Sequence, residues 1–569
     1  MRSEPSKGKV LEVRAISGLH VVTLAWDFVE GQEAKRDGLL GFAIERSELD
    51  QAGQVIERYY LRGIKRFKFK DEGVPPGTPM PTSEHPIQSF QWCDYTAKPK
   101  TTYQYKVVPV YGKPKLLELD DTSATTVKIT TEPEKGQKGN DGKAIHDVYF
   151  NRGVAGSQAY IRKFKTAPDQ TQPDSDQMKW LSRGLFEALT GFIRLAAGED
   201  AADYKLRAML YEFQYRPVGE SFHDAKVAGA DVAIRYEAQS YKEENEAMIT
   251  AADIGGICVS QKSRAGIRHN KFIVLIHKNE PIAVWTGSTN ISVGGIFGHS
   301  NVGHVVWDKE VANRYLNYWE RLANPKVTRG PLVKENLKTE ATPALHSVPP
   351  ADRVLTLFSA RDDKDTLETL HWYADLMGSA QRVLCMTFAF GLDKVFEEVL
   401  KQPGQTLRYA VFDKNVAPDV ESQIDQVRNT VIAAGAKLEK GDMENFIGER
   451  LTGFNRNYYI HDKFMLVDPL GEDPIVVTGT ANFSGPSQYN NDENMLVIRG
   501  NTRVADIYFG EFMRIFDHFY SRYIVAKLTK AGLNDPNAGF LKENAKDWVP
   551  QHFIKDSRKD LRRRYFMGE

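Results

Sequence analysis

Short runs in which apolar and polar residues alternate fill the first 131 positions and predict β-strands. The clearest runs span residues 20–28, 41–49, 103–111 and 125–132. Alternation with a period of two turns one face of each strand toward a core and the other toward solvent. Residues 1–131 are therefore expected to form an all-β sandwich.

This region resembles a fibronectin type III domain in the positions of two aromatic residues. Trp26 stands where that family buries a tryptophan, and Tyr103 stands where it places the tyrosine corner. Both are expected to pack in the core and to take no part in chemistry. By analogy with such domains, the resemblance implies a protein or glycan partner, although the sequence names none.

From residue 145 onwards, apolar runs alternate with amphipathic stretches, a pattern typical of an α/β sheet covered by helices. Strands are expected at 205–213 and 231–237, and again at 382–390 and 407–412. The pattern therefore predicts α/β architecture for most of the chain.

Two segments that lack apolar periodicity divide the chain. Residues 132–144 are polar and rich in Gly and Lys, and residues 331–350 carry prolines. Both are expected to be linkers that bury little surface. The expected units are a β-sandwich over 1–131, α/β blocks over 145–330 and 351–530, and a C-terminal extension over 531–569.

The two α/β blocks carry the same motifs at a constant offset of 192 residues. HNKFIVLI at 269–276 matches HDKFMLVD at 461–468, and TGSTN at 286–290 matches TGTAN at 478–482. The period far exceeds the roughly 20–50 residues of solenoid repeats. A whole domain is therefore expected to be duplicated.

Each copy places a histidine two positions before a lysine at the start of an apolar run, so both side chains are expected on one face of a strand. An imidazole can attack phosphorus or move a proton, and a fixed ammonium attracts phosphoryl oxygens. An asparagine in each copy adds a neutral donor. The candidate catalytic residues are His269, Lys271, Asn290, His461, Lys463 and Asn482.

Two HxK motifs, each followed by a GSxxN-like sequence, resemble the phospholipase D superfamily over about residues 145–530. The resemblance implies a duplicated α/β fold with pseudo-two-fold symmetry. It also implies a ping-pong phosphodiesterase without cofactor or metal, in which one histidine becomes a phosphohistidine and the other moves protons. Because both copies are in one chain, a monomer is sufficient for a complete site, and an oligomer is not ruled out.

The first motif lacks the aspartate that completes the second. Asp468 ends the second motif, and Ile276 stands at the matching place in the first. The family places this aspartate away from the phosphate. Asp468 is therefore expected to be a structural hydrogen-bonding residue.

A second difference separates the copies, because Glu493 corresponds to Asn301 at the same offset. In family members with both copies in one chain, this position orients the histidine of the opposite copy. The resemblance thus implies that Glu493 contacts His269 and that Asn301 contacts His461. A carboxylate stabilises a positive imidazolium, so His269 is the expected nucleophile and His461 the expected acid. Tyrosyl-DNA phosphodiesterases show a similar asymmetry.

Composition narrows the class of protein. Lys+Arg and Asp+Glu both number 75, so the zero net charge excludes the strong basic excess of a protein that coats nucleic acid. The mean hydropathy of −0.45 and the lack of an apolar run near the roughly 18 residues of a membrane span indicate a soluble protein. Three dispersed cysteines and no secretory signal favour the cytoplasm, with a specialised secretion route left open.

Three functions remain open on the sequence alone. The first is phospholipid headgroup hydrolysis or transfer, for which Ile296 and Phe297 are candidates for an exposed apolar rim or for packing under the sheet edge. The second is a nuclease, favoured by basic stretches at 62–70, 161–165 and 557–566. The third is a binding protein with an inactive core. Four further histidines, expected to be core or surface residues, are His223, His277, His299 and His304.

Overall fold

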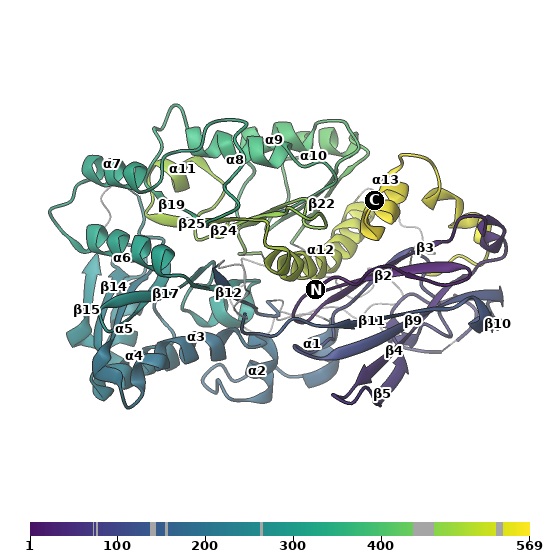
Figure 1. Ribbon diagram of the computed structural model, residues 1–569, viewed down its shortest axis with the longest axis horizontal. Helices are drawn as coiled ribbons and strands as arrows, with labels where there is room; N and C mark the ends of the chain where they lie inside the picture. The colour runs from purple at the N-terminus through teal and green to yellow at the C-terminus, as the bar shows by residue number, and fades with distance from the viewer. Residues whose placement is uncertain are drawn as a thin grey trace.

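The computed structural model describes residues 1–71, 73–75, 78–136, 144–153, 158–261, 266–435, 460–530 and 539–569. In this part of the chain, two seven-stranded sheets lie beside a smaller all-β region that contains the N-terminal strands (Figure 1). The α/β and all-β regions predicted from the sequence are both present.

The N-terminal region contains two larger antiparallel sheets and one two-stranded sheet. The first has the order β1 (Ser6–Lys7), β2 (Leu11–Ser17), β3 (Val22–Phe28), β8 (Gln91–Asp94). The second has the order β10 (Leu116–Leu119), β9 (Thr102–Lys113), β4 (Gly41–Leu49), β5 (Val55–Tyr60), with β11 (Thr125–Thr130) also on β9. A two-stranded sheet pairs β6 (Arg62–Gly63) with β7 (Met80–Pro81).

The core of this region contains the two aromatic residues expected there. Trp26 is fully buried and meets Phe42 edge to face, with 5.3 Å between ring centroids. Tyr103 is also buried, and its hydroxyl oxygen accepts a hydrogen bond from the backbone N–H of Lys98 at 2.9 Å. Both side chains therefore have packing roles, as predicted.

The first seven-stranded sheet is mixed. It has the order β12 (Ile145–Phe150), β18 (Val302–Trp307), β17 (Glu280–Gly287), β16 (Lys271–His277), β13 (Tyr204–Leu210), β14 (Asp231–Glu237), β15 (Cys258–Gln261). Four antiparallel pairings are followed by two parallel ones.

The second seven-stranded sheet shows the same succession of antiparallel and parallel neighbours. It has the order β19 (Leu355–Ser359), β25 (Glu493–Arg499), β24 (Ile475–Gly479), β23 (Phe464–Val467), β20 (Val383–Phe388), β21 (Leu407–Phe412), β22 (Thr430–Ala434). Strands at the same place in the two sheets therefore have the same neighbours.

Helices cover both sheets, and α6 (Lys309–Ala323) and α12 (Thr502–Lys530) lie between them (Figure 1). Apolar residues from the facing sides of the two sheets share one core with these two helices. The outer face of the first sheet packs on α3 (Leu185–Arg194), α4 (Arg216–Ala228) and α5 (Lys242–Ala251). The outer face of the second packs on α8 (Glu368–Gly378) and α9 (Lys394–Leu400). The remaining helices are α1 (Gln158–Phe164), α2 (Asp176–Ser182), α7 (Arg329–Thr339), α10 (Pro418–Asp425), α11 (Gly485–Tyr489) and α13 (Arg558–Met567).

The segment 331–350 differs from the expected linker, because α7 occupies its first part. Pro331 lies in the first turn of this helix, where a missing N–H costs no intrahelical hydrogen bond. Asn336 is fully buried, and its Nδ2 donates to the Ala360 carbonyl at 3.0 Å. The prolines therefore begin and follow a packed helix.

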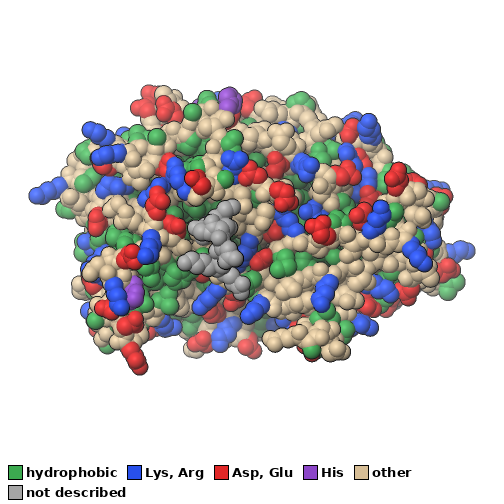
Figure 2. All heavy atoms as spheres, in the orientation of Figure 1, with side chains coloured by type: hydrophobic (Ala, Val, Ile, Leu, Met, Phe, Trp, Pro, Cys, Tyr) green, Lys and Arg blue, Asp and Glu red, His purple; other side chains and the backbone are tan. Residues whose placement is uncertain are grey.

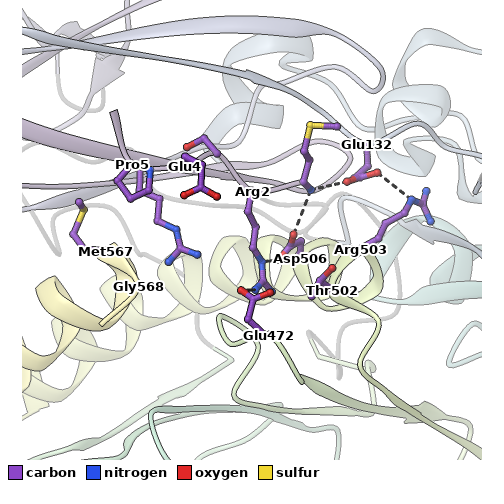
Figure 3. A pocket seen from close by; sticks show the side chains of 13 residues that line it. Arg2, Glu4, Pro5, Glu132, Glu472, Thr502, Arg503, Asp506, Met567 and Gly568 are labelled. Atoms are coloured by element: carbon purple, nitrogen blue, oxygen red, sulfur yellow. Dashed lines mark hydrogen bonds and ion pairs between the residues drawn. The ribbon is translucent and has the colours of Figure 1, made fainter. Parts of the chain in front are cut away.

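The expected linker 132–144 is also partly packed, although its residues 137–143 lie outside the described residues. Glu132 is buried and forms ion pairs with the N-terminal amine at 2.5 Å and with Arg503 at 3.0 Å (Figure 3). Arg2 and Asp506 pair nearby at 2.8 Å, beside a polar pocket of about 450 Å³. The carboxylate of Glu132 thus ties the end of the sandwich to α12.

The C-terminal residues pack on the N-terminal sandwich, since Trp548 and Val549 join its core. Two of the five basic side chains in the stretch 557–566 form ion pairs: Arg563 contacts Asp27, and Arg564 contacts Asp560. Acidic and basic side chains are also interspersed over the face in Figure 2. These pairings weaken the case for this stretch as a nucleic-acid contact. Among the described helices, none is long and apolar enough to cross a membrane.

Candidate functional site

The sequence predicts that both motif histidines open a strand, but in the structure they lie just before the strands. β16 begins at Lys271, and β23 begins at Phe464. The backbone N–H of His269 donates to the Asp492 carbonyl at 3.1 Å, and that of His461 donates to the Ser300 carbonyl at 3.2 Å. Asp492 precedes β25, and Ser300 precedes β18. Each motif is therefore held by backbone contact with the opposite block.

The two imidazoles also reach across to the opposite block. His269 Nδ1 lies 2.8 Å from Glu493 Oε2, and His461 Nδ1 lies 2.9 Å from Asn301 Oδ1. Asn301 Nδ2 donates to the Gly295 carbonyl at 2.8 Å, which fixes the orientation of the amide. Both contacts implied by the family resemblance are present. With the proton held on Nδ1 by these acceptors, Nε2 of each neutral ring carries the lone pair.

The histidines have lowered pKa values but unequal surroundings. Burial lowers the pKa of His269 to about 4, and the Glu493 carboxylate opposes this shift. Burial and the Lys463 ammonium hold the pKa of His461 well below its usual value. Both rings are therefore neutral near pH 7 in the free site, and the ring beside a carboxylate has the stronger electrostatic support for positive charge.

The two lysines occupy matching positions. Lys271 Nζ donates to the His269 carbonyl at 2.6 Å, and Lys463 Nζ donates to the His461 carbonyl at 2.6 Å. Burial lowers the pKa of each lysine to about 7. A bound anion favours the protonated ammonium groups, so these side chains are suited to hold a phosphodiester.

Asn290 and Asn482 follow β17 and β24, at the same edge of each sheet as the HxK residues. The side-chain Oδ1 of each is buried and has no hydrogen-bond partner among the described residues. Gly287 begins the first of these loops at φ +122°, and a Cβ there would lie 2.3 Å from the Val302 carbonyl oxygen. Only glycine fits this close approach to β18, which brings Asn290 back over the sheet edge.

Asp468 lies at the far end of β23 and contacts backbone, not the histidines. Its carboxylate accepts hydrogen bonds from the N–H groups of Gln381, Arg382 and Val383 at 2.8, 2.7 and 3.0 Å. Ile276, at the matching place in the first block, is buried in the core between the sheets. These contacts anchor the start of β20.

Replacing Asp468 with alanine is expected to lower the free energy of unfolding by about 1–3 kcal/mol, because three backbone donors lose their acceptor. The kcat/KM for a phosphodiester is expected to change by less than about twofold, since the carboxylate is at the other end of the strand from Lys463. Urea unfolding and steady-state kinetics measure the two quantities. A hundredfold loss of kcat/KM with unchanged stability would assign this carboxylate to the chemistry.

Ile296 and Phe297 do not form an exposed apolar rim, because both side chains are fully buried. They lie in a single helical turn, Gly294–Gly298, and Phe297 packs on Phe186 and Tyr215 with ring-centroid distances of 5.8 and 5.5 Å. The turn thus directs these side chains inward, and the alternative of packing under the sheet edge holds.

Three side chains near the motifs were not identified from the sequence as site residues. Glu212 accepts a hydrogen bond from Ser292 Oγ at 2.7 Å and interacts electrostatically with both motif lysines. The Tyr211 ring lies 4.7 Å from the ring of His269. His299 was expected to be an ordinary core or surface histidine, but its ring lies 6.2 Å from that of His461. The antiparallel pairing of β13 with β16 is the signal that would have placed Tyr211 and Glu212 beside the motif.

A family model described as "Cardiolipin synthase, PLD-like domain" matches residues 416–516. The matched segment contains His461, Lys463, Asn482 and Glu493. The match therefore lies within the second α/β block and includes its HxK motif. The comparison with curated proteins gives no match.

Several solved structures are similar over part of the chain. Phosphatidylserine synthase from Haemophilus influenzae Rd KW20 has 12% identity and a TM-score of 0.39, covering 62% of this chain and 91% of that chain. Nuc from Salmonella typhimurium, a phospholipase D family member, has 19% identity and a TM-score of 0.22, covering 32% and 94%. Polyphosphate kinase from Porphyromonas gingivalis has 12% identity and a TM-score of 0.34, covering 55% of this chain and only 46% of the kinase.

Proposed function

We propose that this protein is a phosphodiesterase of the phospholipase D type that acts through a phosphohistidine. The observation that carries the proposal is the pair of crossed contacts, His269 to Glu493 and His461 to Asn301. They orient two imidazoles from different blocks with the same ring nitrogen available, beside two buried lysines. This arrangement supplies a nucleophile, a proton carrier and anion-binding groups.

In the first step, His269 Nε2 attacks phosphorus and the bond from phosphorus to the leaving oxygen breaks. His461 Nε2 gives its proton to that oxygen. In the second step, His461 takes a proton from water or an alcohol, whose oxygen attacks phosphorus and breaks the P–N bond. The Glu493 carboxylate stabilises the imidazolium of the intermediate through Nδ1–H. The groups proposed to bind the non-bridging oxygens are Lys271, Lys463, Asn290 and Asn482.

His461 must be protonated to act as the acid, whereas burial and the neighbouring lysines depress its pKa in the free site. The negative charge of a bound phosphodiester opposes that depression. Proton uptake at His461 is therefore coupled to substrate binding. The proposed steps use the chain's own side chains and no cofactor or metal.

We propose phospholipid headgroup hydrolysis or transfer as the reaction. The description of the matching family model names a phospholipid synthase, which supports this substrate class. Arg563 and Arg564 of the basic stretch at 557–566 are paired with carboxylates, which weakens the support that this stretch gives to the nuclease. Cleavage of nucleic acid and binding without catalysis remain distinct outcomes of the test.

We further propose that the α/β blocks are copies of one domain related by a pseudo-two-fold axis. The common strand order and the 192-residue offset support this. The contact between Tyr103 and the Lys98 backbone supports a fibronectin type III-like identity for the sandwich, and a protein or glycan is its proposed partner. One chain contains both histidines, so a monomer is sufficient for the reaction.

The test is a single reaction that contains EDTA, mixed phospholipid vesicles and single-stranded DNA, analysed by mass spectrometry for wild type and His269→Ala. We expect released headgroup and phosphatidic acid, or an exchanged headgroup when an alcohol is present, with wild type only. Shortened DNA in place of lipid products would replace the lipid proposal with the nuclease. No product from either substrate would favour a binding protein.

A further inference from the structure

A carboxyl group lies beside the proposed phosphate-binding donors and has no role in the steps above. Glu212 is largely buried, two residues beyond the end of β13, at the sheet edge where the first HxK motif lies. It accepts a hydrogen bond from Ser292 Oγ at 2.7 Å, and the Asn290 side chain also interacts with it. Ser292 and Asn290 belong to the loop after β17. The carboxylate thus connects two segments that form the site.

The same carboxylate acts electrostatically on both motif lysines. Burial lowers the pKa of Lys271, its repulsion from Lys463 lowers it further, and the carboxylates of Glu493 and Glu212 raise it. Burial likewise lowers the pKa of Lys463. The carboxylates that raise the pKa of Lys463 are Glu493, Asp462, Asp413 and Glu212.

The position related to Glu212 in the second sheet holds no carboxylate. Ala208 pairs with Ile273 in the first sheet, and Met386 pairs with Met465, which is 192 residues after Ile273. Counting four residues onward from each gives Glu212 and Phe390. Since Phe390 is 46% exposed, the duplicated fold itself does not require a buried acid at this place.

We infer that Glu212 is a positioning residue that braces the loop carrying Ser292 and Asn290 and favours the protonated forms of Lys271 and Lys463, so that the site can bind a phosphodiester anion. Two ammonium groups buried close together repel one another, and a carboxylate that faces both offsets this repulsion. Burial raises the pKa of Glu212, an effect that Ser292 and the two lysines oppose. The substrate named in this inference rests on the proposed function, whereas the effect of Glu212 on the two lysines does not.

The test is Glu212→Gln, which preserves the size of the side chain and removes its charge. The pH profile of kcat/KM reports pKa values of the free enzyme, so loss of the carboxylate is expected to move the alkaline limb down by about one pH unit. At pH 8, kcat/KM for bis(p-nitrophenyl) phosphate should fall about tenfold relative to wild type, and at pH 6 it should fall by less than about threefold. Glu243→Gln, on the exposed side of α5, is the matched control and should leave the profile unchanged.

Binding of tungstate, measured by calorimetry over the same pH range, separates the failure of this inference from the failure of the proposed function. Suppose that wild type does not hydrolyse the diester, but that rising pH abolishes tungstate binding at a lower pH in Glu212→Gln than in wild type. Glu212 then has its inferred role and the proposed function is wrong. The inference would be overturned if kcat/KM of Glu212→Gln fell by the same factor at every pH, or if the alkaline limb of its pH profile did not shift. If wild type neither hydrolyses the diester nor binds tungstate, both proposals are wrong. Thermal unfolding checks that the variant is folded.

Discussion

Replacing His269 with glutamine is expected to reduce kcat/KM for a phosphodiester by about 10⁴-fold or more, because the variant lacks the nitrogen that attacks phosphorus. Glutamine is of similar size and can still donate a hydrogen bond to Glu493, so the fold around the site should persist. Release of p-nitrophenol from bis(p-nitrophenyl) phosphate measures the loss, and thermal unfolding provides the control for folding.

The matched variant His461→Gln should behave differently, although its turnover is also lost. p-Nitrophenolate is a good leaving group and needs little help from an acid, so the first step should still occur. The second step needs a base to activate water, so the intermediate should accumulate. We therefore expect a burst of about one equivalent of p-nitrophenol and a p-nitrophenyl phosphoryl group on His269, located by mass spectrometry under alkaline conditions. A phosphoryl group on His461 in His269→Gln, with none on His269 in His461→Gln, would reverse the assignment.

The sequence and the family resemblance were sufficient to predict the two crossed histidine contacts, because both blocks carry the same motifs at one constant offset. His269 and His461 could each be paired with a residue of the other copy from the 192-residue offset and the family resemblance, and both contacts are present. The predicted start of both strands was wrong, because β16 begins at Lys271 and β23 at Phe464. The backbone bridges to Asp492 and Ser300 hold the histidines in extended segments before β16 and β23, and such bridges depend on contacts between blocks that no local pattern shows.

Residues that are not repeated could not be found in this way. Glu212 corresponds to Phe390, so a comparison of the two blocks gives no signal there. For Ile296 and Phe297, which follow glycines, the sequence left exposure and packing equally open, and one helical turn buries both of them. The prolines near residue 331 indicated an irregular segment, although a helix tolerates proline in its first turn. Each error concerns tertiary packing that local composition does not determine.

The second large effect is expected at a buried ion pair that joins the blocks at a distance from the histidines. Glu511 of α12 lies 2.5 Å from Arg183 Nη2 and 2.8 Å from Arg514 Nε. The side chains of Glu511 and Arg183 are both almost completely buried. Arg514 also donates to the Asn151 carbonyl at 3.0 Å, and Asn151 Oδ1 accepts from the Asn301 backbone N–H at 3.0 Å. The cluster therefore supports the loop that orients His461.

Replacing Glu511 with glutamine is expected to lower the free energy of unfolding by about 3–5 kcal/mol, because it leaves two arginines buried without a counter-charge. Glu310→Gln is the control: its carboxylate pairs with Arg314 on α6 but is 65% exposed, so the loss should stay below about 1 kcal/mol. Urea unfolding at pH 7 measures both changes. A loss below about 1 kcal/mol for Glu511→Gln would contradict the assigned role of the cluster.

The pH dependence of the free energy of unfolding provides an independent test of the same ion pair. Despite burial, which acts in the opposite direction, Arg183 and Arg514 lower the pKa of Glu511 from 4.5 to about 2 in the folded protein. A carboxyl whose folded pKa is depressed contributes stability above its unfolded pKa and loses that contribution as the pH falls toward the folded value. Wild type should therefore lose its stability advantage over Glu511→Gln between about pH 4.5 and pH 2. The difference should stay constant from pH 5 to pH 7, because Glu511 is ionised in both the folded and the unfolded wild-type chain there.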